Sequence, residues 1–217
     1  MILIIVFGAG IAGFLQKYKP VKNEEIEKKI KEIEEWNDNW EISENRNYNP
    51  DIYKKYDYKL NFYEPCCLNL DSNPEKEFVE YLEESKDKIL WWWQNGDEHM
   101  ALNFGIKCDE NGKTFQPDFI VMFKNGEIGI YDTKASGFQE DDNKLKAEAL
   151  QKYIKEENKR KKKELLVGGI VIKEGGHFRI NSDEKYEPFK DVIGVKDEGV
   201  KYKVGDDGQK GWKYLEF

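Results

Sequence analysis

Histidine and cysteine are scarce in this chain, which has two histidines and three cysteines in 217 residues. Zinc centres and Ser-His catalysis both depend on such residues. Cys66, Cys67 and Cys108 have no zinc-ligand spacing with His99 or His177, and no GxSxG motif is present. An odd cysteine count with two adjacent members is also a poor disulfide framework. We therefore expect reduced thiols and a cytoplasmic protein, and neither a zinc site nor a serine hydrolase.

An overall excess of positive charge is also missing, because the formal net charge is −8. This argues against general adhesion to nucleic acid, whose usual signature is a basic surface. One local exception is residues 143–163, with nine Lys or Arg against three Glu. Lys144, Lys146 and Lys152 in this stretch are candidate phosphate contacts. A solvated helix face explains them equally well.

The chain has a single long apolar run, Met1 to Leu15. It is shorter than the roughly 20 residues of a membrane-spanning helix, and no basic region precedes it as in a signal peptide. We expect it to pack on protein, and a membrane anchor is the less favoured alternative. Its Gly8 to Gly13 string matches a dinucleotide-binding fingerprint. A nucleotide-cofactor protein is therefore a further hypothesis, and it requires a βαβ unit at the N-terminus. However, the stretch that follows, Asn23 to Trp36, is charged and is predicted to be a helix.

Hydrophobic residues at 39% and aromatic residues at 14% are enough for a packed core. The pattern predicts a helix from about Ser72 to Ser85 with Phe78 and Leu82 inward, and a longer helix from Asp142 to about Lys162 with Leu145, Ala149 and Ile154 inward. Predicted strands, including a short one in the irregular segment 37–73, cover the following ranges: Tyr58 to Tyr63, Ile89 to Trp93, Ala101 to Lys107, Phe119 to Phe123, Ile128 to Tyr131 and Leu166 to Ile172. We read the three tryptophans at 91–93 as core rather than as a base-stacking platform.

This order predicts an α/β (α+β) fold, with a mixed sheet of about four to five strands flanked by helices. The expected core is residues 69–173. Residues 1–68 would form an N-terminal extension with the apolar segment, the charged helix and an irregular wrapping segment. Residues 174–217 would form a β-rich C-terminal extension.

Two acidic residues and a lysine lie on one predicted hairpin. Pro117-Asp118 opens its first strand, and Asp132-Thr133-Lys134 closes its second. Side chains alternate along a strand, so Asp132 and Lys134 share a face. A three-residue loop, Lys124 to Gly126, would place Asp118 directly opposite Asp132, whereas a two-residue loop would send it to the other face. Gly126 fits the left-handed third position of the longer loop.

Paired carboxylates in a half-buried site repel each other, and a hard divalent cation such as Mg²⁺ removes that penalty. Such a cation activates water and neutralises charge on a phosphodiester. Lys134 would orient the water or stabilise the phosphate. Glu75 shares the helical face of Phe78 and is the favoured third carboxylate, and Glu77, about 160° away around the helix, is the second choice.

These residues resemble the E…PD…(D/E)xK pattern of the restriction-endonuclease-like superfamily. The flanking stretches 91–96, 117–121, 129–134 and 168–171 are similar to the C-terminal nuclease region of type III restriction enzymes and DEAD/DEAH-box helicase-nucleases. The resemblance covers roughly Glu64 to Lys173, although the chain contains no helicase motor.

The resemblance implies a DNA endonuclease that depends on Mg²⁺, for which Mn²⁺ can substitute. Asp118, Asp132, Glu75 and the Thr133 carbonyl would hold the metal, and Lys134 would assist the base. A helicase motor or a methyltransferase is a candidate partner. A homodimer is a further hypothesis, because cutting both strands usually demands two active sites. The alternative is a catalytically silent module that binds nucleic acid or docks onto a helicase.

Overall fold

The computed structural model describes part of the chain in detail. The described residues are 16–17, 47–48, 50–70, 72–95, 104–108, 114–135, 140–162, 165–189 and 211–217. The apolar segment Met1 to Leu15, with its glycine string, and the charged stretch Asn23 to Trp36 lie outside these ranges. No helix within them is long and apolar enough to cross a membrane.

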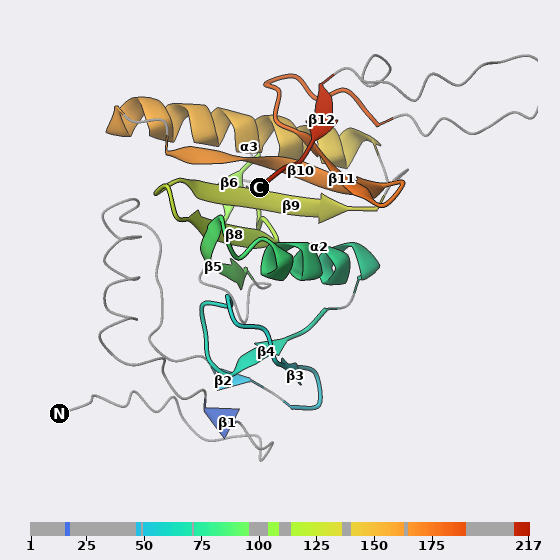
Figure 1. Ribbon diagram of the computed structural model, residues 1–217. Helices are drawn as coiled ribbons and strands as arrows, with labels where there is room; N and C mark the ends of the chain where they lie inside the picture. The colour runs from blue at the N-terminus through green and yellow to red at the C-terminus, as the bar shows by residue number, and fades with distance from the viewer. Residues whose placement is uncertain are drawn as a thin grey trace, which may run out of the picture.

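A six-stranded mixed sheet forms the centre of the molecule (Figure 1). Across the sheet its strands are β12 (Trp212–Tyr214), β11 (His177–Asn181), β10 (Leu166–Glu174), β9 (Ile128–Lys134), β8 (Phe119–Phe123) and β5 (Ile89–Gln94). β9 and β10 are parallel, and every other neighbouring pair is antiparallel. The expected mixed sheet is confirmed. It has one strand more than the upper limit expected, because β11 and β12 of the C-terminal extension join its edge.

Two helices cover opposite faces of this sheet (Figure 1). α2 (Asn73–Glu84) follows the cap residue Ser72, whose Oγ accepts a hydrogen bond from the Glu75 amide at 3.3 Å. Pro74 occupies the first turn, where its missing N–H has no helical partner to lose. The buried side of α2 presents Phe78, Val79 and Leu82 to the sheet. The predicted start, end and inward face of this helix are confirmed.

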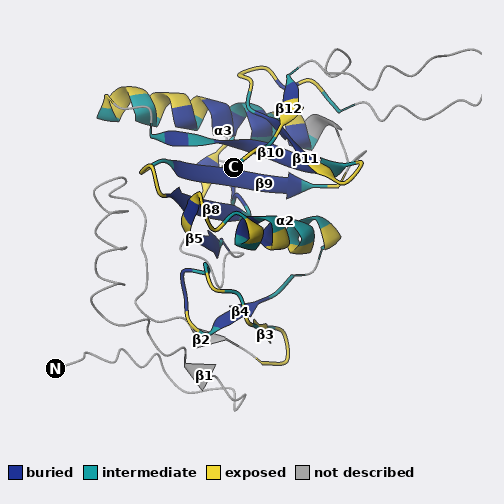
Figure 2. Cartoon of the chain, viewed as in Figure 1, coloured by how far each residue is buried: buried dark blue, intermediate teal, exposed yellow. Residues whose placement is uncertain are grey.

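α3 (Glu140–Lys161) lies along β10 on the other face. Ala149, Leu150 and Ile154 are buried there, while Leu145 is half-buried rather than fully inward. Figure 2 shows the outer side of α3 as mostly exposed, and β9 and β10 as buried between the two layers. The sheet is therefore covered on both faces, which explains its continuous apolar strands.

The tryptophan run in β5 is divided between the two faces of the sheet. Trp91 and Trp93 pack in the core on the α3 side, and Trp92 packs in the core on the α2 side. All three are at most 1% exposed. Their burial confirms their assignment as core residues. They are divided between the two faces because consecutive side chains of a strand point to opposite sides of the sheet.

In the described ranges, three two-stranded sheets are separate from the main sheet. They are β1 (Gln16–Lys17) with β2 (Asn47–Tyr48), β3 (Lys54–Tyr56) with β4 (Cys66–Leu68), and β6 (Ile106–Lys107) with β7 (Thr114–Phe115). The strand predicted for Ala101 to Lys107 is confirmed at its C-terminal end, which forms β6 outside the main sheet, and residues 101–103 lie outside the described ranges. The prediction for Tyr58 to Tyr63 is wrong. That segment makes one isolated bridge, Asn61 to Trp92. Its backbone hydrogen bonds to β5, through Leu60 and Phe62, are both made with Trp92.

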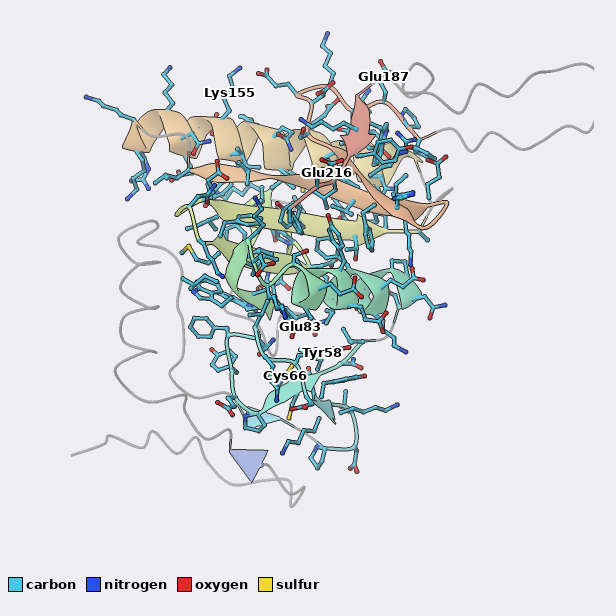
Figure 3. All side chains as sticks on the ribbon, in the orientation of Figure 1. Tyr58, Cys66, Glu83, Lys155, Glu187 and Glu216 are labelled. Carbon is cyan, nitrogen blue, oxygen red and sulfur yellow. The ribbon has the colours of Figure 1, made fainter. Side chains whose placement is uncertain are left out.

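Glu83 near the end of α2 fastens this segment to the sheet. Its carboxylate accepts hydrogen bonds from the amides of Lys59 (2.8 Å) and Leu60 (2.9 Å), and from Trp92 Nε1 (2.8 Å). Figure 3 shows Glu83 and Tyr58 close together on this side of α2. One carboxylate thus satisfies three donors from two separate parts of the chain.

We expect Glu83→Ala to lower the free energy of unfolding by about 2 kcal/mol or more, because three N–H groups lose a charged acceptor. Urea denaturation of the purified chain measures this. Glu84→Ala is the matched control, since Glu84 is exposed in the same helical turn and should change stability by less than about 0.5 kcal/mol. Equal losses in both variants would contradict the role of Glu83.

Candidate metal and phosphodiester site

The β8–β9 hairpin has the register that the three-residue loop predicts. The Phe123 amide donates to the Glu127 carbonyl at 2.9 Å, and Phe119 pairs with Tyr131. Gly126 has φ +89°, a left-handed conformation that disfavours other residues. The predicted loop is confirmed, and it carries the two acidic residues to the same end of the sheet.

Asp132 is the buried carboxylate at this end of the sheet. It lies on β9, the strand between β8 and β10, and is 1% exposed. Lys134 lies two residues further along, with its Nζ 2.6 Å from Asp132 Oδ2. This oxygen is fully buried, and the Lys134 ammonium is the cation that neutralises it. Lys134 Nζ also donates to the Thr133 carbonyl at 3.1 Å.

Asp118 reaches the same strand end, where its side chain contacts Thr133. Its Oδ2 accepts hydrogen bonds from the backbone amide and the Oγ1 of Thr133, both at 2.7 Å. The hairpin register continues to place Asp118 opposite Asp132. However, Asp118 precedes the first residue of β8, so the pleat does not fix its side chain. The predicted register is confirmed, and Thr133 is the residue that holds the Asp118 side chain at this strand end.

The electrostatics of the cluster depend on burial. Burial raises the pKa of Asp132 to about 7, and the negative charge of Asp118 adds to this rise, while Lys134 and Lys146 oppose it. For Lys134, burial alone would lower the pKa, but the carboxylates of Asp132, Asp118 and Glu75 outweigh it and raise the pKa. The lysine is thus held as an ammonium ion by three carboxylates.

The two candidate carboxylates of α2 have different surroundings. Glu75 contributes to the potential at Lys134, and its Oε2 lies 3.5 Å from Gln94 Nε2. Glu77 forms an ion pair with Lys173 at 3.1 Å. Of the two, Glu75 is the one whose charge acts on Lys134. No sequence motif identifies Gln94 as a neighbour of the cluster. The signal is its position after the aromatic run and before Asn95-Gly96, which places it at the end of β5.

The three candidate phosphate-binding lysines separate into two groups. Lys144 and Lys152 are exposed on α3. Lys146 forms an ion pair with Asp142 at 3.0 Å and is near enough to influence Asp132. Of the three, Lys146 is therefore the one whose charge acts on the carboxylate cluster.

The oxygen atoms of this cluster fit a hard divalent cation. A buried carboxylate, a second carboxylate beside it and an adjacent backbone carbonyl are the kinds of oxygen ligand that Mg²⁺ prefers. In the described residues no three acidic, histidine or cysteine side chains are yet arranged closely enough to enclose an ion. Lys134 Nζ lies among the oxygens instead.

The fold and site together define an α+β protein with a mixed sheet and a buried carboxylate-lysine cluster at one end of it. A family comparison matches residues 64–180 to the YagJ family, which is more than half of the chain, so the chain belongs to the YagJ family. The match includes Glu75, Asp118, Asp132 and Lys134. Searches of curated proteins and of solved structures gave no match.

The raised pKa of Asp132 predicts how stability depends on pH without metal. Between about pH 4 and 7 the folded protein keeps a proton that the unfolded chain has lost, so the free energy of unfolding should fall as pH rises, by up to about 1.4 kcal/mol per pH unit. Asp132→Asn should remove this fall. Urea denaturation from pH 5 to 8 in EDTA measures it, with exposed Asp87→Asn as control. An unchanged slope in Asp132→Asn would contradict the assignment.

Proposed function

We propose that this protein is a metal-dependent endonuclease that hydrolyses DNA phosphodiester bonds at the end of β9. The observation that carries the proposal is the buried Asp132 carboxylate, which has Asp118 and the ammonium of Lys134 beside it. Desolvating a carboxylate next to a second acid costs free energy, and such arrangements concentrate at functional sites.

Each residue has a role in this proposal. Asp118, Asp132 and the Thr133 carbonyl would hold Mg²⁺ or Mn²⁺, and Glu75 would complete the acidic set from α2. The bound ion would supply Lewis acidity and a more acidic water. Thr133 keeps the Asp118 carboxylate against β9 through its amide and hydroxyl. Lys134 would place its positive charge beside the phosphate oxygen on which charge develops.

Two further observations support this reading. The order helix α2, strands β5, β8 and β9, helix α3 and strand β10 agrees with the element order expected from the restriction-endonuclease-like resemblance. All three cysteines are free thiols, in keeping with a cytoplasmic enzyme. DNA as the polymer rests on the resemblance to type III restriction nucleases, as does a helicase or methyltransferase partner. A homodimer would supply the two active sites that cutting both strands demands.

A silent module that docks onto a helicase or binds nucleic acid is the second candidate. One observation favours it: the Lys134 ammonium neutralises the buried Asp132 carboxylate. A permanent ion pair of this kind would leave a stable fold and no catalysis.

The direct test is cleavage of supercoiled plasmid by the purified chain with Mg²⁺, Mn²⁺ or EDTA. We expect nicking with either metal and none with EDTA. Asp132→Ala and Lys134→Ala should each lose about 100-fold or more of the rate, because several kcal/mol of charge stabilisation disappear. A wild-type chain that binds no metal and cuts no DNA would favour the silent module.

A matched pair of variants tests the contribution of α2. Glu75→Gln should reduce Mg²⁺ affinity and cleavage by roughly 10-fold or more, since one acidic group facing the cluster becomes neutral. Glu77→Gln, two residues away and paired with Lys173, should cleave at the wild-type rate. Titrating Mg²⁺ in the nicking assay compares the two. The reverse order of effects would exchange their roles.

A further inference from the structure

We propose that the Lys134 ammonium occupies the cation position of the metal-free site, so that a divalent metal binds by displacing it. The inference rests on the proposed function, because it concerns the same carboxylates. It adds to Lys134 a role in setting metal affinity, besides its role at the phosphate.

The contacts of Lys134 Nζ are the contacts expected of the metal. Nζ lies 2.6 Å from Asp132 Oδ2 and 3.1 Å from the Thr133 carbonyl oxygen. These are two of the oxygens assigned to the ion. The charges that act most favourably on the ammonium belong to Asp132, Asp118 and Glu75, the complete acidic set of the proposed site. One cation therefore already uses the ligands that another would need.

The position is enclosed rather than a surface ion pair. The side chain of Lys134 is 17% exposed and that of Asp132 is 2% exposed. Two cations cannot share these oxygens at close range without strong repulsion, because a buried site screens charge poorly. Entry of a divalent ion therefore requires Nζ to leave.

Displacement would also prepare the lysine for catalysis. A lysine side chain is a flexible stem that carries a compact charge. Once it leaves Asp132, the ammonium remains next to the strand end, where a phosphate would approach the metal. Metal binding and the release of the phosphate-binding cation would then be a single exchange.

Isothermal titration with MnCl₂ tests the exchange in the full chain. Lys134→Met keeps the length of the stem and removes the charge, so it should bind Mn²⁺ about 10-fold tighter than wild type or more. Lys146→Met is the matched control. It also removes a nearby positive charge, but Lys146 pairs with Asp142 and not with the cluster, so its effect should be a few-fold at most.

Amine acetylation followed by mass spectrometry tests the same exchange in the wild-type chain, in case Lys134→Met fails to fold. Lys134 should react slowly without metal and several-fold faster with saturating Mn²⁺. Exposed Lys152 is the internal reference and should not change. Protection of Lys134 that is the same with and without bound Mn²⁺ would overturn the proposal.

The outcomes separate this inference from the nuclease proposal. Equal Mn²⁺ affinity in wild type and Lys134→Met, with binding lost in Asp132→Asn, overturns the exchange and leaves the metal site standing. An equal gain in Lys146→Met also overturns it, because any nearby charge would then suffice. Binding by Lys134→Met but not by wild type supports it. No Mn²⁺ binding in any folded variant overturns both proposals.

Discussion

The register of the β8–β9 hairpin is the constraint on which the candidate site depends. A three-residue loop closed by Gly126 pairs Phe119 with Tyr131, and the chain just before β8 then meets the chain at the end of β9. A slip of one residue would turn every side chain of β9 to the other face. The core would then lose Ile130, and Asp132 would leave its buried position.

The same strand links stability to chemistry. β9 has β8 on one side and β10 on the other, and both helices cover it, so Asp132 at its end is taken out of water by the surrounding core. Burial raises the free energy of the ionised carboxylate, and Lys134 offsets part of that cost. The fold thus leaves a buried carboxylate whose charge is only partly compensated. Both proposals rest on this charge, since a divalent ion would compensate it more fully than an ammonium.

The match to the YagJ family covers residues 64–180, which include the hairpin and both helices, but it does not include the edge strand β12. The matched residues contain the hairpin, both helices and the whole acidic set, so the candidate site belongs to the part of the chain that defines the family. β12 adds an edge to the sheet, and the residues after it pack against the core that α2 forms with the sheet. Tyr81 Oη donates to the Leu215 carbonyl at 2.8 Å there, and the ring of Phe217 stacks on that of Tyr81.

The sequence by itself determined the local elements. Ser72 and Pro74 set the start of α2, Gly126 set the hairpin loop, and short apolar and aromatic runs predicted the strands of the main sheet. These follow from short-range rules of capping, backbone conformation and alternation. Tertiary structure alone decided that Asp118 turns to Thr133, that Glu77 pairs with Lys173 while Glu75 faces the cluster, and that β11 and β12 extend the sheet. Each of these depends on side chains or strands far apart in the chain, whose distances no local pattern contains.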